Sequence, residues 1–118
     1  MQEGDLHTQL RAVLGEEGFV LLCQAVGGTR VYVPRKPRDD NEIVTAIGRE
    51  LADKLSREMA SATIRVPLAR RERAIYFRQV QGLSNAKIAR KLGITEGGVN
   101  KLFAQVQDLP DKRVQSSR

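Results

Sequence analysis

The sequence predicts a mainly α-helical protein, with an N-terminal helical domain that holds one or two short β-strands and a C-terminal helix-turn-helix domain. Three observations support this fold class. Residues 14–34 and 47–67 are similar at a constant offset of 33, which is typical of one supersecondary unit used twice. Residues 84–103 have the caps, small residues and apolar residues that two closely packed helices with a tight turn require. All of the excess positive charge lies after residue 69.

The charge divides the chain into two halves. Residues 70–118 have 11 basic and 4 acidic side chains, a net charge of +7, whereas residues 1–69 have 9 and 10, a net charge of −1. A basic module attached to a neutral one is typical of a polyanion-binding part joined to an assembly part, although a basic surface can also serve solubility alone. We therefore expect a dimerisation domain over residues 1–69, a DNA-binding domain over residues 70–107 and a disordered basic tail over residues 108–118.

Composition excludes several classes of protein. One cysteine and one histidine rule out a disulfide framework and a His/Cys zinc site within one chain. No apolar run approaches the roughly 20 residues of a membrane span, and the acidic, polar start is not that of a signal peptide. We therefore expect a cytoplasmic protein that uses no metal or cofactor and has no membrane partner.

Each repeat is expected to contain two short helices and a strand, within residues 1–35 and 41–69. Apolar residues at helical spacing predict the first helix of each repeat. Gly15 or Gly48 should then kink or break it, because glycine weakens a helix by about 1 kcal/mol relative to alanine. Residues 19–23 are nearly all apolar, which predicts deep burial of the second helix in the first repeat.

The two strands end in the same way. The glycine pair at residues 27–28 should stop the preceding helix, because glycine tolerates the left-handed backbone of a helix C-terminus. Strands are expected at residues 29–33 and 63–66, and they should end at Pro34 and Pro67, which lack the N–H that a ladder needs. Such strands must pair with each other, which closes a monomeric core, or with a partner chain. We favour the partner chain, because so small a module often completes its core by dimerising.

The C-terminal half follows the pattern of a helix-turn-helix. Its first helix is expected to bury Ala74, Phe77 and Val80, with Leu83 beyond its end. Ser84 should cap a helix over residues 85–92, in which the small Ala89 permits close approach of the next helix. Gly93 then takes the tight turn, and Thr95 caps a third helix. The inner face of that helix is expected to contain Val99, Leu102 and Phe103.

A helix-turn-helix places the outward N-terminal residues of its last helix in the major groove of double-stranded DNA. Those residues are Glu96, Gly97, Asn100 and Lys101. Asn100 is suited to adenine, Lys101 to guanine or a phosphate, and Glu96 to cytosine. The expected phosphate contacts are Ser84 and Thr95, which lie at helix N-termini that favour anions, and the basic residues Arg70, Arg71, Arg73, Lys87, Arg90 and Lys91.

Two consecutive glycines, Gly97 and Gly98, fall in the first turn of the expected recognition helix. Each costs a helix about 1 kcal/mol relative to alanine. Close approach of the backbone to the duplex would explain them. Packing that holds the rest of the helix, and so tolerates glycine in its first turn, would explain them equally well.

The segment GGTRVYVP (residues 27–34), preceded by an apolar helix and followed by a C-terminal helix-turn-helix, resembles the Mor family of bacteriophage middle-operon transcription activators. The similarity extends from about residue 15 to residue 106. The helix-turn-helix is the less specific part, since its residues GLSNAKIARKLGITEGGV (82–99) are also similar to sigma-factor region 4 and to response-regulator DNA-binding domains.

The resemblance implies a phage or prophage activator. In that family the N-terminal helices and strand form an intertwined homodimer, and two helix-turn-helix units grip a partly symmetric site and recruit host RNA polymerase. The implied dimer strand contains Val31, Tyr32 and Val33, and to these we add Leu22, Ile64 and Val66 as expected dimerisation residues. The second repeat, residues 41–67, departs from the founding pattern, which leaves open which strand forms the dimer ribbon and how far apart the DNA-binding units lie.

Other functions stay open beside activation. Repression would use the same DNA-binding mode, and a polymerase-binding adaptor would use the helix-turn-helix without DNA. Enzymatic activity has little support, because the nearest acidic grouping, Asp39, Asp40 and Glu42, lies in the Pro-rich connector over residues 34–41. A histidine can activate a cysteine nucleophile, so His7 and Cys23 could in principle form such a pair. Cys23 lies in the most apolar stretch, however, which indicates a buried structural thiol. We therefore expect that the protein is not an enzyme.

Overall fold

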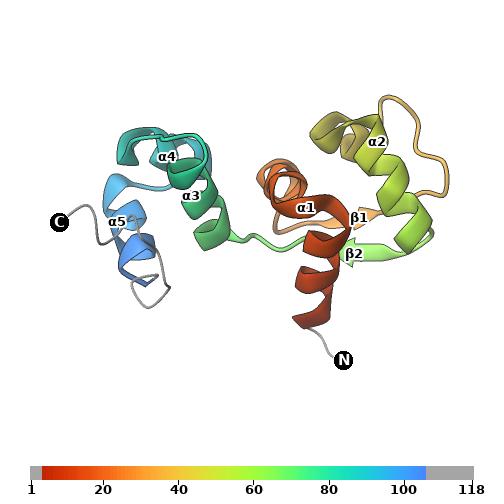
Figure 1. Ribbon diagram of the computed structural model, residues 1–118, viewed down its shortest axis with the longest axis horizontal. Coiled ribbons are helices and arrows are strands. Elements are labelled where there is room, and N and C mark those ends of the chain that lie inside the picture. Colours follow the sequence, from red (N-terminus) through yellow and green to blue (C-terminus); the bar gives the residue numbers. More distant parts are fainter. Residues whose placement is uncertain (1–3, 106–118) are drawn as a thin grey trace. The chain divides into compact units, whose positions relative to one another are not determined.

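The computed structural model describes residues 4–105, and the chain divides into two compact units, Met1–Leu68 and Ala69–Arg118. The N-terminal unit contains α1 (Gly4–Val26), β1 (Arg30–Tyr32), α2 (Glu42–Met59) and β2 (Thr63–Arg65) (Figure 1). The C-terminal unit contains α3 (Arg70–Gln79), α4 (Asn85–Leu92) and α5 (Glu96–Gln105). The prediction of a mainly helical chain with one or two short strands is confirmed, and the described residues contain two. The expected tail, residues 108–118, lies outside the described residues. Within the described part, no helix is long and apolar enough to cross a membrane.

Both helices of the N-terminal unit bend at the predicted glycines. Gly15 interrupts α1 with φ 77° and ψ 171°, and Gly48 interrupts α2 with φ 90° and ψ 164°. A positive φ is a conformation that glycine adopts freely and other residues rarely adopt. The predicted kinks are therefore confirmed, and they fall at the same place in each repeat.

The hydrogen bonds at the strand ends also repeat at the offset of 33. The Gly28 N–H donates to the Val66 carbonyl (2.8 Å), and the Ser61 N–H donates to the Val33 carbonyl (2.7 Å). Gly28 has φ 82° and Ser61, at the equivalent position of the second repeat, has φ 69°. Both residues therefore have a left-handed backbone conformation. The weak sequence repeat is thus a repeat of structure as well.

A local two-fold relation joins the two repeats. β1 and β2 pair in antiparallel fashion with Val31 opposite Ile64, which are equivalent positions of the two repeats. A second equivalent pair lies between the helices, where a Cβ placed on Gly18 would come within 2.8 Å of Leu51 Cδ1. Contacts between equivalent positions are what a two-fold axis produces. The strands therefore pair within one chain, which corrects our preference for a partner chain.

The same pairing places most of the expected dimerisation residues in the core of the chain and not at a dimer interface. Leu22, Val33 and Val66 are 0% exposed, Val31 is 2% exposed and Ile64 is 7% exposed. All five belong to the core of a single chain, because the second repeat supplies the strand that a second copy was expected to supply. Of the six expected residues, only Tyr32 lies on the surface, with 54% of its area exposed.

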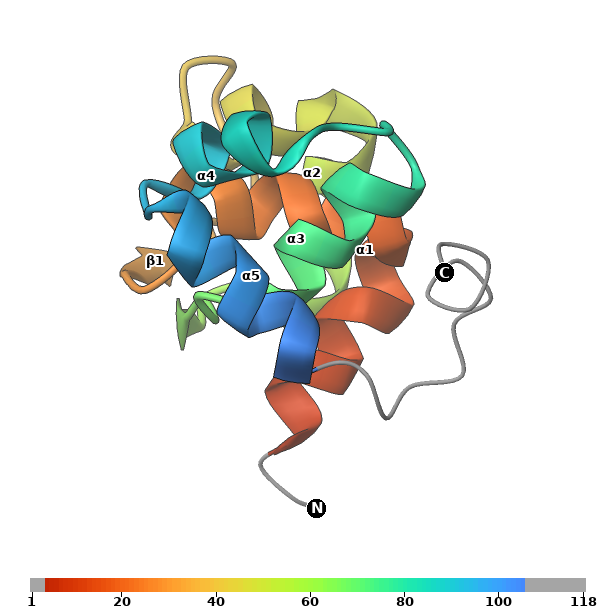
Figure 2. The same cartoon turned by 90° about the vertical axis from the view of Figure 1, so that its left-hand side faces the viewer.

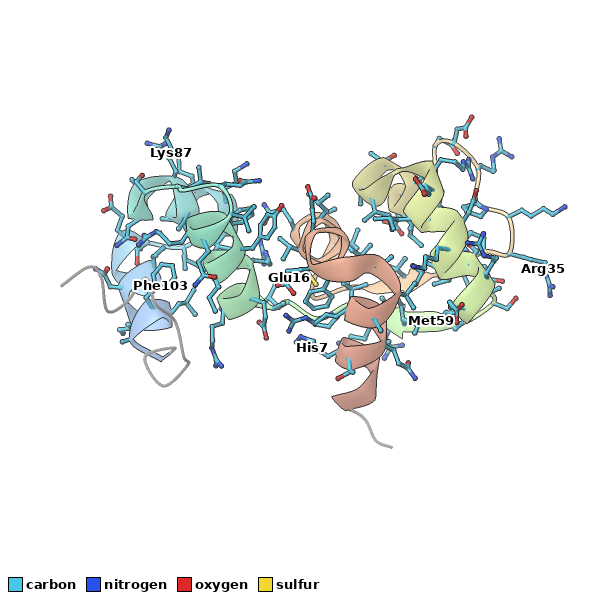
Figure 3. The ribbon with its side chains drawn as sticks, viewed as in Figure 1. His7, Glu16, Arg35, Met59, Lys87 and Phe103 are labelled. Atoms are coloured by element: carbon cyan, nitrogen blue, oxygen red, sulfur yellow. The ribbon has the colours of Figure 1, made fainter. Side chains whose placement is uncertain are left out.

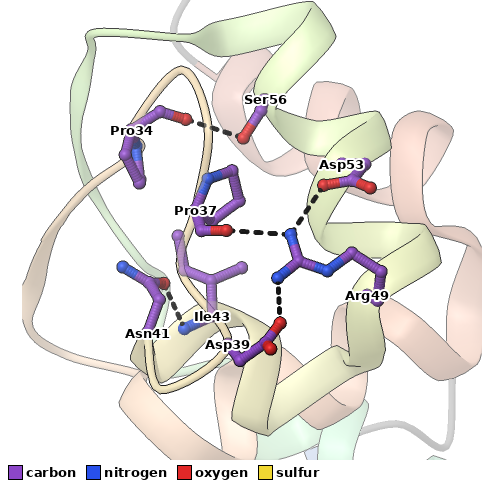
Figure 4. Close-up of polar contacts among 8 residues, drawn as sticks. All are labelled: Pro34, Pro37, Asp39, Asn41, Ile43, Arg49, Asp53 and Ser56. Carbon is purple, nitrogen blue, oxygen red and sulfur yellow. Dashed lines mark hydrogen bonds and ion pairs between the residues drawn. The ribbon is translucent and has the colours of Figure 1, made fainter.

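Arg49 ties the connector between the repeats to α2 (Figure 4). Its Nη1 donates to the Pro37 carbonyl (2.8 Å) and to Asp53 Oδ1 (3.0 Å), and its Nη2 donates to Asp39. The hydrogen bonds to Asp39 and then to Asp53 raise the pKa of Arg49 above its ordinary value, so the guanidinium stays charged. Two further hydrogen bonds hold the connector, from the Ile43 N–H to Asn41 Oδ1 (2.8 Å) and from Ser56 Oγ to the Pro34 carbonyl (2.7 Å).

The residues considered for enzymatic chemistry have other surroundings. Asp39 is paired with Arg49, and within residues 4–105 no three His, Cys, Asp or Glu side chains could hold a metal together. The His7 ring stacks on Phe19 with the ring centroids 4.8 Å apart. Cys23 is 1% exposed, which confirms the prediction of a buried thiol.

Candidate nucleic-acid interface

The C-terminal unit forms two capped helices joined by a tight turn. Ser84 Oγ accepts a hydrogen bond from the Lys87 N–H (3.2 Å) at the start of α4, and Thr95 Oγ1 accepts one from the Gly98 N–H (2.9 Å) at the start of α5. Between them Gly93 ends α4 with φ 74°. Both predicted caps and the predicted turn are confirmed, and the bounds of α4 are those expected from the sequence.

The three helices of this unit pack against one another in pairs (Figure 2). The buried apolar residues of these helices are Ala74, Tyr76, Phe77, Ile88, Ala89 and Val99. The Ala89 carbonyl accepts the N–H groups of both Gly93 (2.8 Å) and Ile94 (3.0 Å), which closes the turn between α4 and α5. One core prediction was wrong. Val80 is 63% exposed, because α3 ends at Gln79 and Val80 caps it.

The expected base-reading residues share one property, which is exposure to solvent. They are Glu96, Gly97, Asn100 and Lys101, all on α5. The two capping residues, Ser84 and Thr95, are also exposed. Among the described residues 70–105 there are 8 basic and only 2 acidic side chains, so the unit that carries α5 has a strongly positive field.

Most of the expected phosphate contacts are exposed too. They are Arg70, Arg71, Lys87, Arg90 and Lys91. Lys87 points away from the helices (Figure 3). The Lys91 ammonium lies 5.7 Å from the centre of the Phe77 ring. Arg73 is different, with only 5% of its area exposed. It is one of the buried residues of α3, so we withdraw it from the set of phosphate contacts.

A polar chain that sequence reasoning missed connects all three helices. Arg78, on α3, donates from Nε to the Leu83 carbonyl (3.0 Å) and from Nη2 to Asn85 Oδ1. Asn85 in turn donates from Nδ2 to Asn100 Oδ1 (2.8 Å). The Arg78 guanidinium carbon also lies 4.7 Å from the centre of the Phe103 ring. The sequence offers no local signal for this chain, because its members come from three different helices.

Comparison with known families bears on this unit alone. Residues 68–106 match the family model described as "Sigma-70, region 4". No match was found among curated proteins or among solved structures. The match spans the capped helices, the turn and the exposed face of α5. The chain therefore carries a helix-turn-helix domain similar to sigma-70 region 4, a DNA-binding domain of transcription regulators.

Proposed function

We propose that the chain is a sequence-specific regulator of transcription that reads the major groove of double-stranded DNA with α5. The observation that carries the proposal is the exposed face of α5, within a helix-turn-helix that matches sigma-70 region 4. Asn100 and Lys101 would contact base edges, because a helix-turn-helix presents the N-terminal half of its last helix to the groove. Glu96 and Gly97 lie on the same face.

The remaining exposed groups would position the domain on the duplex. Ser84 and Thr95 lie at helix N-termini, where partial positive charge favours a phosphate. Arg70, Arg71, Lys87, Arg90 and Lys91 would each neutralise a backbone phosphate. Such contacts add affinity without sequence information and make the affinity fall as salt rises.

The test compares two lysine variants on the duplex that the full chain enriches from a random pool. Lys101→Ala should weaken binding by about 1–3 kcal/mol, which is the worth of a base contact. Lys54→Ala is the matched control, because Lys54 is an exposed lysine on α2 in the other unit. Equal affinities of the two variants would contradict the assignment of α5 as the recognition helix.

We further propose, on the resemblance to the Mor family, that two copies act together on a partly symmetric site as a phage or prophage activator. Such a homodimer would have to use side chains that the pairing of β1 with β2 leaves exposed, because the two strands already pair with each other. Tyr32 is an exposed candidate for that surface. Light scattering on the DNA complex tests this. Two chains per duplex support it, and one chain contradicts it.

A polymerase-binding adaptor is the second candidate, and the match to sigma-70 region 4 favours it. In this case the C-terminal unit would bind RNA polymerase and would not need DNA. Affinity for polymerase without salt-dependent affinity for any duplex would favour the adaptor over the DNA reader. Activation and repression share one DNA-binding mode, so a reporter with the enriched site placed upstream of a promoter or across it separates them.

A further inference from the structure

The hydrogen-bonded chain from Arg78 to Asn100 has a direction that chemistry dictates. A guanidinium has five N–H donors and no acceptor. The group of Asn85 that faces Arg78 must therefore be its oxygen, as the structure has it. Asn85 consequently turns its NH₂ group toward Asn100, and an NH₂ group only donates.

The same logic fixes the amide of Asn100. The atom that faces the Asn85 NH₂ must be Oδ1, which lies 2.8 Å from it. The oxygen and nitrogen of a surface amide are normally interchangeable by a half turn about the last side-chain bond. Here the half turn would place two NH₂ groups against each other. These hydrogen bonds thus leave the NH₂ group of Asn100 available to a ligand.

Arg78 is well placed to anchor this chain. Its guanidinium is half-buried, and the Leu83 carbonyl and the Phe103 ring hold it as well as Asn85. Three contacts on one planar group restrict its rotation, so it orients Asn85 as a fixed donor. Asn100, at the other end, is exposed on α5.

We infer that Arg78 and Asn85 are positioning residues that set the base preference of Asn100, by presenting its NH₂ group to a hydrogen-bond acceptor on the base. This inference rests on the proposed function. The major-groove edge of a purine offers N7, guanine adds O6 and thymine offers O4, whereas cytosine offers only its amino donor. The contacted strand position therefore accepts guanine, adenine or thymine and rejects cytosine.

The test reverses the donor–acceptor direction of the hydrogen bond between residue 85 and Asn100. Asn85→Asp keeps an oxygen toward Arg78 but places a second oxygen, in place of the NH₂ group, toward Asn100. The Asn100 amide must then turn its NH₂ group toward this carboxylate and its oxygen toward the ligand. Gln81→Glu is the matched control, because Gln81 is exposed in the turn before α4 and the change adds the same negative charge. Asn100→Ala identifies which position of the DNA site Asn100 contacts. It is the position at which the sequences enriched by this variant no longer show a base preference.

The full chain and its variants are used in selection from a random duplex pool. The wild-type chain should disfavour cytosine at the contacted position by about tenfold or more. Asn85→Asp should remove or reverse that bias at this position alone, whereas Gln81→Glu should weaken all sequences equally. An unchanged base profile in Asn85→Asp, or a wild-type preference for cytosine, would overturn the inference.

Failure of the proposed function looks different. If the wild-type chain enriches no sequence, then both the function and the inference are overturned. NMR of the free chain examines the hydrogen-bonded chain separately from DNA. Asn85→Asp should shift the side-chain amide signals of Asn100, and Gln81→Glu should leave them in place. Unmoved Asn100 signals in Asn85→Asp, beside normal DNA selection, would overturn the inference alone.

Discussion

Replacing Gly97 with alanine separates the two explanations of the glycine pair in α5. A Cβ at Gly97 would have no neighbour closer than Thr95 Oγ1 at 3.7 Å, which is ordinary van der Waals contact. Gly97→Ala therefore meets no obstacle inside the protein, and the loss of glycine's backbone freedom should stabilise α5 by about 0.5–1 kcal/mol. Packing within the chain gives no reason for glycine at this exposed position.

Either glycine is merely tolerated at this position, or the Gly97 backbone approaches the duplex closely. If the backbone does approach closely, an added methyl group on the face of α5 that we propose enters the groove should weaken DNA binding, by about tenfold for 1.4 kcal/mol of lost contact. Gly98→Ala is the control. A Cβ on Gly98, which is half-buried, would lie 3.3 Å from Ile94 Cδ1, so it faces the protein and should change DNA affinity little.

The assay pairs hydrogen exchange of the α5 amides with DNA affinity measured by fluorescence anisotropy. Gly97→Ala should slow exchange in α5 and weaken DNA binding at the same time. If exchange slows and affinity is unchanged, close approach is refuted and the glycine is merely tolerated. If exchange becomes faster, then the space seen beside Gly97 does not exist and the reasoning fails at its first step.

Three further substitutions test the fold and the interface. Gly27→Ala should destabilise the N-terminal unit by about 1–3 kcal/mol in urea denaturation, because its Cβ would lie 2.4 Å from the Cys23 carbonyl oxygen and 2.8 Å from that of Pro67; wild-type stability would contradict this packing. Lys87→Ala should reduce the slope of log affinity against log salt by about 1, and an unaltered slope would remove Lys87 from the phosphate contacts. Arg73→Ala should lower the melting temperature and leave that slope alone, since Arg73 is 5% exposed; the opposite pattern would place it at the DNA.

Local signals in the sequence predicted the local features of the fold. Gly15 and Gly48 mark the kinks because glycine is the residue that adopts a positive φ freely. Ser84 and Thr95 mark the helix starts because their hydroxyl groups accept orphan backbone N–H groups. These effects act over three or four residues, so one sequence is enough to see them.

Features that depend on distant contacts were not predictable in the same way. Pairing of β1 with β2 requires residues 31 and 64 to meet, and a strand pattern alone does not say which strand is the partner. The burial of Arg73 depends on tertiary contacts, and its charge suggested the opposite. The chain through Asn85 likewise needs three helices to be in place before any hydrogen bond forms.

Selection of bound duplexes from a random pool at physiological salt tests the central claim most directly. The full chain should enrich a defined sequence, because on our proposal the exposed Asn100 and Lys101 of α5 contact base edges. If a homodimer forms, the enriched sequence should be an inverted repeat with half-sites about one helical turn, roughly 34–36 Å, or a multiple of it apart. Enrichment of no sequence, together with binding that disappears as salt rises, would mean that the basic unit attracts phosphates alone and would contradict sequence reading.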